Sequence, residues 1–528
     1  MAFPYTELLF DLLGGQDSLN NPSEIPQIPQ QTEIGTLDPR IPVRFPTAQD
    51  VWSPSDRADI ATRPGNSDVR ATAINAAGIG TGMLDQGAIA ARFLLTVSIV
   101  SGSHQPYEDA ANPPTVIAGG TNLTIGQDNL TTLLNFTDGT NRGTIIVSRL
   151  RDLPQFINAA GTRSDFTVAG TGLTSLKPGF GEIFGQRALY ADYDQDGTVH
   201  KNRLAYTDLR DGNLISDITV QSESFERREL DDQIRGMRRL SDFCIVGGRD
   251  YIELLGLTPT FEKPFGRQEV AGGIGKGPLS HQGMIVCDQR CVWNSASGII
   301  SIEGSQGEVL KDWTTHIKPY YTGSLDQDRL RFCAAGYDPK TDIGCWAVSE
   351  TGQTTHNKII AINFKRGEIY IWTLSRNAFA NRIVSGEHRL IGMGYVGLFR
   401  NEIQTSVFTG NADDASAAID ADIFTPRHHC QLPGIKKLFA GIKIWFDQQG
   451  TSEAVTVQYR LDDAASWSNF SASPYTVTGT AGDVNLKYFP LMKAGKNLQV
   501  RFRDANSGQA FRVLKYALLF KIVEPGLV

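Results

Sequence analysis

Residues 283–302, GMIVCDQRCVWNSASGIISI, show the pattern that decides the fold. Two turn signals divide this stretch into short runs rich in Ile, Val and Trp: residues 288–290 form the first signal and Ser297-Gly298 forms the second. No helical segment separates the runs, so we expect consecutive runs to pair as antiparallel hairpins.

The same pattern extends in both directions, from about residue 85 to about residue 425. Turn dipeptides such as Asp196-Gly197 and Arg366-Gly367 lie between strand-like runs that recur at intervals of about ten residues. About 340 residues of consecutive hairpins exceed one β-sandwich, whereas four-stranded blades of about 45–50 residues around an axis accommodate them. The sequence therefore predicts a β-propeller of roughly five to seven blades. The other expected strands lie at residues 93–100, 143–148, 187–193, 202–207, 243–248, 358–364, 368–374 and 396–408.

The flanks of this region differ from it and from each other. Residues 1 to about 70 are rich in Pro, Gln, Asn and Asp and have no sustained period, apart from weak helical patterns at 58–61 and 69–77. Such a segment buries little surface by itself, so we expect an extended arm laid against another surface. After residue 430, apolar and polar residues alternate, as in 498–503, which is typical of a β-sandwich with one wet face. We therefore predict an all-β chain with an extended N-terminal arm at 1–75, a β-propeller at 76–427 and a C-terminal β-sandwich at 428–528.

Composition and charge exclude several classes of protein. Of the 528 residues, 41% are hydrophobic, which supplies a core and excludes wholesale disorder. The formal net charge is −7, so there is no global basic field to hold nucleic acid by counterion release. The longest apolar runs have about eight residues, whereas a membrane-spanning helix needs about 20, so we expect no membrane span. Residues 1–11 lack a basic segment before an apolar one, and we expect no secretory signal.

One acidic motif has the opening of a calcium-binding loop. Asp192, Asp194 and Asp196 alternate and are followed by Gly197. The twelfth position of such a loop supplies a bidentate acid, but this position is Arg203 here. We therefore interpret the motif as an acidic hairpin tip closed by Asp196-Gly197, and a calcium site would need a distant carboxylate to complete its shell.

Other motifs give no site for a cofactor or a catalytic reaction. The glycine-rich stretch 271–278 lacks the Gly and Ser/Thr positions of a phosphate-binding loop. Cys287 with Cys291, and residues 428–430, have no second pair of ligands at the spacing of a zinc site. The six cysteines are expected to form no disulfide framework and to be mostly buried as small hydrophobic residues. No nucleophile elbow or protease signature occurs, so we predict no cofactor and no enzymatic activity, although two carboxylates suited to glycoside cleavage would leave no motif.

The densest basic stretch lies at residues 227–239. Its five arginines are interleaved with acidic residues. This alternation is typical of a solvated face or an ion-pair network. The functional alternative is a subunit interface that uses the planar guanidinium forks.

Three sets of motifs carry a resemblance to a known family. The first is DLLGGQD at 11–17, followed by AQDV at 48–51 and TRPG at 62–65. The second lies at 235–253 and the third at 275–304. Their order resembles that of the β-propeller tail proteins of tailed bacteriophages, the hub, nozzle or DNA-stabilisation proteins below the portal. Thr62 departs from that pattern, in which Lys or Arg is common.

This resemblance implies a structural virion protein of the phage tail. It implies a homohexameric ring around a channel, which helps to retain the genome and allows double-stranded DNA to pass during ejection without sequence-specific binding. The expected partners are further copies of the chain and other tail, adaptor or portal proteins, with synthesis in the host cytoplasm and residence in the virion. The candidate interface residues are Gly14, Gly15, Asp17, Arg63, Arg227, Arg228, Arg235, Arg238 and Arg239.

Two other functions stay open at this point. A tail-tip or baseplate adhesin would bind host surface glycan, and Trp445, Tyr459 and Trp467 would stack on sugars if they lie on an open face, although the same side chains suit a core. A propeller glycosidase or lyase would gather carboxylates at the propeller axis.

Overall fold

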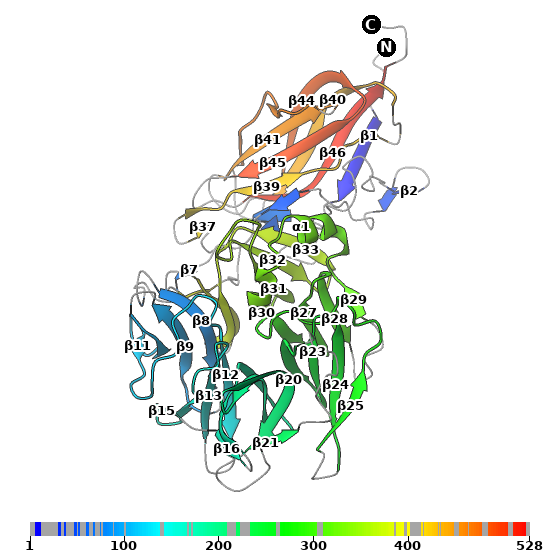
Figure 1. Ribbon diagram of the computed structural model, residues 1–528. Helices are drawn as coiled ribbons and strands as arrows, with labels where there is room; N and C mark the ends of the chain where they lie inside the picture. Colours follow the sequence, from blue (N-terminus) through cyan, green and yellow to red (C-terminus); the bar gives the residue numbers. More distant parts are fainter. Residues whose placement is uncertain are drawn as a thin grey trace.

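The computed structural model of the chain consists almost entirely of β-strands (Figure 1). It describes residues 78–504 and 511–523 with short gaps, together with strands β1 to β7 and Ile74 in the first 77 residues. The gaps lie at residues 88, 100–101, 138–141, 166–167, 171–172, 208–217, 222–232, 260–263, 304–309, 385–386, 395–398, 402–412, 415–416, 431, 433, 448–452, 463 and 478–483.

Seven antiparallel sheets follow one another along the chain and form the blades of a propeller. Blade 1 comprises β8 (Gly78–Asp85), β9 (Phe93–Ile99), β10 (His104–Glu108) and β11 (Thr115–Val116). Blade 2 comprises β12 (Thr131–Thr137), β13 (Arg142–Ser148), β14 (Gln155–Asn158) and β15 (Arg163–Asp165). Blade 3 comprises β18 (Phe180–Phe184), β19 (Arg187–Gln195), β20 (Thr198–Thr207) and β21 (Ile218–Gln221), with the hairpin of β16 (Val168–Gly170) and β17 (Leu173–Lys177) added to the end of β19. Blade 4 comprises β22 (Gly236–Leu240), β23 (Phe243–Gly248), β24 (Tyr251–Leu257) and β25 (Phe265–Glu269).

The remaining blades complete the circle. Blade 5 comprises β26 (Met284–Cys287), β27 (Arg290–Asn294), β28 (Ile299–Glu303) and β29 (Leu310–Asp312). A segment with η1 (Thr315–Ile317), α1 (Lys318–Gly323) and η2 (Arg329–Phe332) leads to blade 6, which comprises β30 (Ala334–Asp338), β31 (Ile343–Val348), β32 (Lys358–Asn363) and β33 (Glu368–Trp372). Blade 7 comprises β34 (Ala378–Val384), β35 (Glu387–Met393), β36 (Phe399–Asn401) and β7 (Ser67–Asp68). No described helix is long and apolar enough to cross a membrane.

The innermost strands close a ring. Contacts run from β8 through β12, β18, β22, β26 and β30 to β34, and β34 in turn contacts β8. The outer strand of blade 7 comes from the other end of the chain, because β7 pairs with β36 through Asp68 with Arg400 and Ser67 with Asn401. The predicted β-propeller is therefore confirmed, with seven blades and a last blade built from both ends of the propeller segment.

The blades bury both of their faces, which explains the continuous apolar runs of the sequence. All six residues of β31 are buried, as are six of the seven residues of β13. The cores lie between adjacent blades, as where Met237 and Cys244 of blade 4 meet Phe184 of blade 3. A strand packed between two neighbours is apolar on both faces, whereas a strand with one wet face alternates.

The stretch 283–302 folds as its turn signals predict. β26 and β27 form a tight hairpin in which Cys287 pairs with Arg290. β27 and β28 lie on either side of the second turn signal, and their Asn294 and Ile299 pair across the turn that contains Gly298.

The C-terminal region is a sandwich of two sheets that lies next to blade 6 (Figure 1). One sheet contains β44 (Val484–Gly495), β40 (Lys437–Asp447) and β46 (Arg512–Ile522). The other contains β39 (Ala421–Phe424), β45 (Leu498–Asp504) and β41 (Glu453–Leu461), with β42 (Ser468–Asn469) and β43 (Tyr475–Val477) on β41, while β37 (Asp413–Asp414) and β38 (Ala417–Ala418) form a separate hairpin. The core between the sheets includes Phe446, Phe489, Phe502 and Tyr516. Because β39 pairs with β45, this sheet begins upstream of the boundary expected at residue 428.

The strands of the arm pair with this same chain. β1 (Thr6–Asp11), β5 (Val51–Trp52) and β6 (Ile60–Thr62) extend the sheet of β46, and β2 (Gln30–Thr32) pairs with β3 (Thr36–Asp38). β4 (Thr47–Gln49) lies between β33 and β39, so one sheet continues from blade 6 into the sandwich. The helical pattern predicted at 58–61 is wrong where β6 occupies it, because pairing with β46 outweighs a weak local propensity.

Candidate functional site

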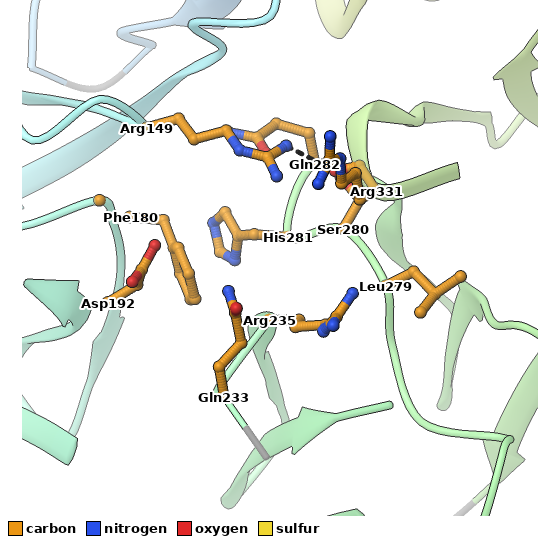
Figure 2. Close-up of a pocket in the computed structure, with 11 residues that line it drawn as sticks. Arg149, Phe180, Asp192, Gln233, Arg235, Leu279, Ser280, His281, Gln282 and Arg331 are labelled. Atoms are coloured by element: carbon orange, nitrogen blue, oxygen red, sulfur yellow. Dashed lines mark hydrogen bonds between the residues drawn. The ribbon is translucent and has the colours of Figure 1, made fainter. Parts of the chain in front are cut away.

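A cavity of about 90 Å³ lies where several innermost strands begin (Figure 2). We call it the axial pocket. Its walls come from five blades: Arg149 follows β13, Phe180 begins β18, Arg235 precedes β22, His281 precedes β26 and Arg331 precedes β30. Gly179, Asp192, Gln233, Leu279, Ser280 and Gln282 complete the lining. Residues that are far apart in the sequence meet here only because the propeller closes.

Arginines give the axial pocket its charge. Arg149 donates from Nη1 to the carbonyl oxygen of Arg331 at 2.6 Å, and its guanidinium lies 4.3 Å above the ring of Phe332. The Arg331 guanidinium lies over the same ring at 4.8 Å. Burial, followed by the proximity of Arg331, lowers the pKa of the Arg149 guanidinium to about 10. The two cations thus share one aromatic ring and repel each other.

The carboxylate that lines the axial pocket already has a cationic partner. Asp192 accepts from Nη2 of Arg151 at 2.7 Å, and Nε of Arg151 donates to the Asp192 carbonyl oxygen at 2.9 Å. Outside the lining, Asp128 pairs with Arg329 at 3.0 Å. Among the described residues, therefore, the acids near the axial pocket are occupied by arginines other than Arg149 and Arg331.

His281 is the central side chain of the axial pocket. It is 3% exposed, its ring stacks on Phe180 with centroids 4.9 Å apart, and Figure 2 shows it among Phe180, Arg149 and Arg235. The backbone N–H of Met237 donates to Nδ1 at 3.3 Å, which leaves the ring proton on Nε2. Burial, with a smaller effect of Arg238, lowers the pKa of His281 well below its usual value, so the ring is neutral at pH 7.

A second cavity, of about 340 Å³, lies along the propeller axis. It is lined by the inner strands of blades 1, 2, 4, 6 and 7, and His281 and Gln282 line both cavities. The axial pocket therefore adjoins this second cavity, which we call the axial cavity. Asp85 is the only carboxylate among the residues that line the axial cavity, so the described residues supply no pair of carboxylates there for glycoside cleavage.

The structure separates the three described arginines of the candidate interface. Arg235 lines the axial pocket. Arg238 pairs with Glu182 at 3.3 Å and donates to the carbonyl oxygen of Met284, so it is part of an internal ion-pair network. Arg239 is exposed. The other candidates lie outside the described residues: Gly14, Gly15, Asp17, Arg63, Arg227 and Arg228.

The acidic motif of blade 3 is a hairpin tip. Gln195 pairs with Thr198 across the Asp196-Gly197 turn, which confirms that interpretation. Asp194 accepts from the backbone N–H of Gly197 at 2.7 Å, and Asp196 accepts from Thr174 Oγ1 at 2.6 Å. Asp192 points away to Arg151. Among the described residues, no group of three or more His, Cys, Asp or Glu residues could hold a metal ion.

The cysteine and histidine clusters are parts of cores. The six cysteines are free and buried, as the sequence predicts. Cys287 and Cys291 lie in hydrophobic clusters on opposite sides of blade 5. His428 is buried and lies 3.0 Å from the hydroxyl oxygen of Tyr516. The glycine-rich stretch packs against blade 4, where a Cβ on Gly277 would overlap the carbonyl oxygen of Gly248.

The three aromatic side chains considered for glycan stacking do not form one surface. Tyr459 is buried and packs edge-on against Phe470. Trp467 packs against Phe424 with a centroid distance of 5.0 Å, whereas Trp445 lies in β40 of the other sheet. No common platform for a sugar ring results from these three residues.

An exposed apolar row lies elsewhere on the sandwich. Among the described strands, β44 is the edge of its sheet and pairs only with β40. Its exposed large apolar side chains are Val484 at 58%, Leu486 at 54%, Tyr488 at 42% and Met492 at 57%. We call these four residues the β44 row. The sequence carries no motif for this row. Its only signal is that apolar and polar residues alternate over 484–488.

Comparisons with known proteins leave the function open. No family model and no curated protein matches the chain. The chain is similar to a catalytically inactive virginiamycin B lyase from Staphylococcus aureus at 11% identity and a TM-score of 0.37, over 64% of this chain and 98% of that one. It is also similar to the N-terminal domain of Nup159, at 10% identity and a TM-score of 0.37, over 67% of this chain and 98% of that one. A third similar structure is the extracellular domain of a putative hybrid two-component system from B. thetaiotaomicron, at 7% identity and a TM-score of 0.40, over 94% of this chain and 67% of that one. Such remote likenesses carry no argument about activity, and the resemblance to phage tail proteins stays a prediction.

Proposed function

We propose that the chain is a non-enzymatic structural component of a bacteriophage tail, at the nozzle, hub or tube end. In this proposal six copies form a ring around the DNA channel, retain the packaged genome and allow its passage. Neighbouring tail, adaptor or portal proteins hold the ring in the virion after synthesis in the host cytoplasm. The order of the motifs at 11–65, 235–253 and 275–304 supports this proposal, and so does the surface of the sandwich.

The β44 row is the observation that carries the proposal. A long edge strand presents unpaired backbone groups, and soluble monomers normally protect such edges with charges, prolines or covering segments. β44 carries the edge-protecting residues Lys487, Pro490 and Lys493, but beside them Leu486 and Tyr488 are each more than two-fifths exposed. Contiguous exposed apolar side chains of this kind mark surfaces that another chain covers. The occupant we propose is a neighbouring copy in the ring.

The strand pairing between the propeller and the sandwich supports a structural role. The propeller closes with a strand from each end of its segment, and one sheet continues from blade 6 through β4 into the sandwich. The two domains are thus tied by backbone pairing as well as by side chains. The formal charge of −7 also suits a channel in which DNA slides without sticking.

The glycan-binding alternative has less support. Trp445, Tyr459 and Trp467 do not share a surface. The axial pocket, at about 90 Å³, has the room of about three water molecules, which is too little for a sugar ring. We therefore favour the structural role.

The assembly state of the purified full chain tests the proposal. We expect mass photometry to find rings of the wild-type chain, and Leu486→Lys to raise the concentration at which rings form by at least about ten-fold. Leu257→Lys is the matched control, because Leu257 is a 57% exposed leucine in blade 4. A wild-type chain that stays monomeric at all concentrations, or a control that impairs assembly as strongly as Leu486→Lys, would contradict the proposal.

A further inference from the structure

The axial pocket has the charge of an anion-binding site. Arg149 and Arg331 are held close together by the bond from Nη1 to the carbonyl oxygen and by their common contact with Phe332. Neither makes an ion pair with a described residue, since the lining carboxylate of Asp192 is bound by Arg151. Two like charges so close together repel each other, and a counter-charge between them removes that cost. The Arg235 side chain adds a third guanidinium to the lining.

A buried donor without an acceptor points into the same space. With Nδ1 of His281 accepting from Met237, Nε2 carries the proton, yet Nε2 has no hydrogen-bond partner among the described residues. Leaving a buried donor unsatisfied costs free energy, and such groups are rare in folded proteins. His281 lines the axial pocket, where Figure 2 shows its ring facing the space beside Arg149. A ligand with acceptor oxygens would satisfy it.

The size of the axial pocket restricts that ligand. A volume of about 90 Å³ holds a phosphate-sized group but not a nucleoside or a hexose. The donors approach from three blades: Arg149 from blade 2, Arg331 from blade 6 and His281 from blade 5. Donors that converge from several directions suit a tetrahedral oxyanion better than a planar carboxylate, which favours two parallel bonds from one guanidinium.

We propose that the axial pocket binds a phosphate-sized tetrahedral oxyanion through the guanidinium groups of Arg149 and Arg331 and the Nε2–H of His281. The bound group neutralises the mutual repulsion of the arginines and ties blades 2, 5 and 6 together where the axial pocket adjoins the axial cavity. The anion is either free phosphate or the phosphate end of a larger ligand that projects out of the axial pocket. This inference does not depend on the role in a phage tail.

Isothermal titration of the full chain with inorganic phosphate at pH 7 and low chloride tests the site. We expect saturable binding with one phosphate per chain, and a loss of affinity of about ten-fold or more in Arg331→Gln. Arg331 is exposed at the rim, so this variant should fold. Arg239→Gln is the matched control, since Arg239 is an exposed arginine in β22 that does not line the axial pocket.

Two further measurements define the ligand. His281→Phe keeps a ring against Phe180 but removes the donor, so it should weaken phosphate binding about ten-fold, and a circular dichroism spectrum checks its fold. Binding of phosphate but not of adenosine monophosphate would identify the free anion, whereas binding of both would identify a phosphate end group. Absence of phosphate binding by the wild-type chain, or equal affinities in wild type and Arg331→Gln, would overturn the proposal.

Discussion

Two ion pairs of the sandwich differ in exposure but not in geometry, and they permit a matched test of what holds β39 to β45. Arg501 donates to Asp422 from Nε at 2.8 Å and from Nη2 at 2.6 Å. Arg503 donates to Asp420 from the same atoms at the same two distances. The side chains of the first pair are 18% and 16% exposed, whereas those of the second are 41% and 50% exposed. The first pair also has more neighbours, because Arg501 donates from Nη1 to Oε1 of Gln458 at 3.1 Å and lies near the rings of Phe424 and Trp467.

The exposure sets the expected strength of each pair. At a separation of about 4 Å, two unit charges attract with about 1 kcal/mol in water and about 4 kcal/mol at an effective dielectric constant of about 20. Side-chain ordering and desolvation remove part of this gain. The guanidinium of Arg501 also lies 5.2 Å from the ring of Phe424, which reduces its contact with water. We expect Asp422→Asn to cost about 2 kcal/mol and Asp420→Asn at most about 0.5 kcal/mol.

Hydrogen exchange measured by mass spectrometry reports the local stability directly. A cost of about 2 kcal/mol corresponds to exchange about thirty-fold faster, and about 0.5 kcal/mol to about two-fold faster. We therefore expect the amides of β39 and β45 to lose protection strongly in Asp422→Asn and slightly in Asp420→Asn. Equal acceleration in the two variants, or a larger effect of Asp420→Asn, would refute the argument that burial decides the strength of these pairs.

Three further predictions concern packing, pH and thiol reactivity. Gly277→Ala should destabilise the propeller by about 2 kcal/mol or more and lower its melting temperature, because the new Cβ overlaps the Gly248 carbonyl oxygen. A Cβ on Gly323 has open space, so Gly323→Ala should be neutral, and equal melting temperatures of the two variants would contradict this prediction. Burial lowers the pKa of His428 to about 3, below the unfolded value of about 6.5, so the buried neutral ring costs stability progressively as the pH falls from about 6.5 toward 3. The melting temperature of His428→Gln should therefore fall less between pH 7 and pH 5 than that of the wild type. Burial raises the pKa of the Cys291 thiol to about 12, and the other five cysteines are buried too. Ellman's reagent should therefore label none of the six thiols in the native chain and all six in denaturant, and rapid labelling of the native chain would disprove their burial.

The local pattern of the sequence predicts the strands of the propeller but not the pairing that completes its last blade. β9, β19, β23 and β32 lie where the β-rich runs predict them, because these runs are buried on both faces and bounded by strong turn signals. β7 has two residues, Ser67 and Asp68, and no period. Its place in blade 7 is set by pairing with β36, more than 300 residues away, which no local pattern records.

The axial pocket was beyond prediction for a similar reason. Arg149, His281 and Arg331 each follow or precede a strand of a different blade, and nothing in the sequence relates the three positions. Arg235 belongs to the basic stretch at 227–239, but its neighbour Arg238 pairs with Glu182 while Arg235 lines the axial pocket. The direction of each side chain depends on blade geometry, which follows only once the ring is closed.

We claim that the chain is a ring-forming component of a phage tail, and cryo-electron microscopy of the particles that contain it tests this claim most directly. We predict six copies of a seven-bladed propeller around the DNA channel, with the β44 row of each copy covered by a neighbouring copy. Particles that carry a single copy of the chain at the distal tip, away from the DNA channel, would contradict the claim.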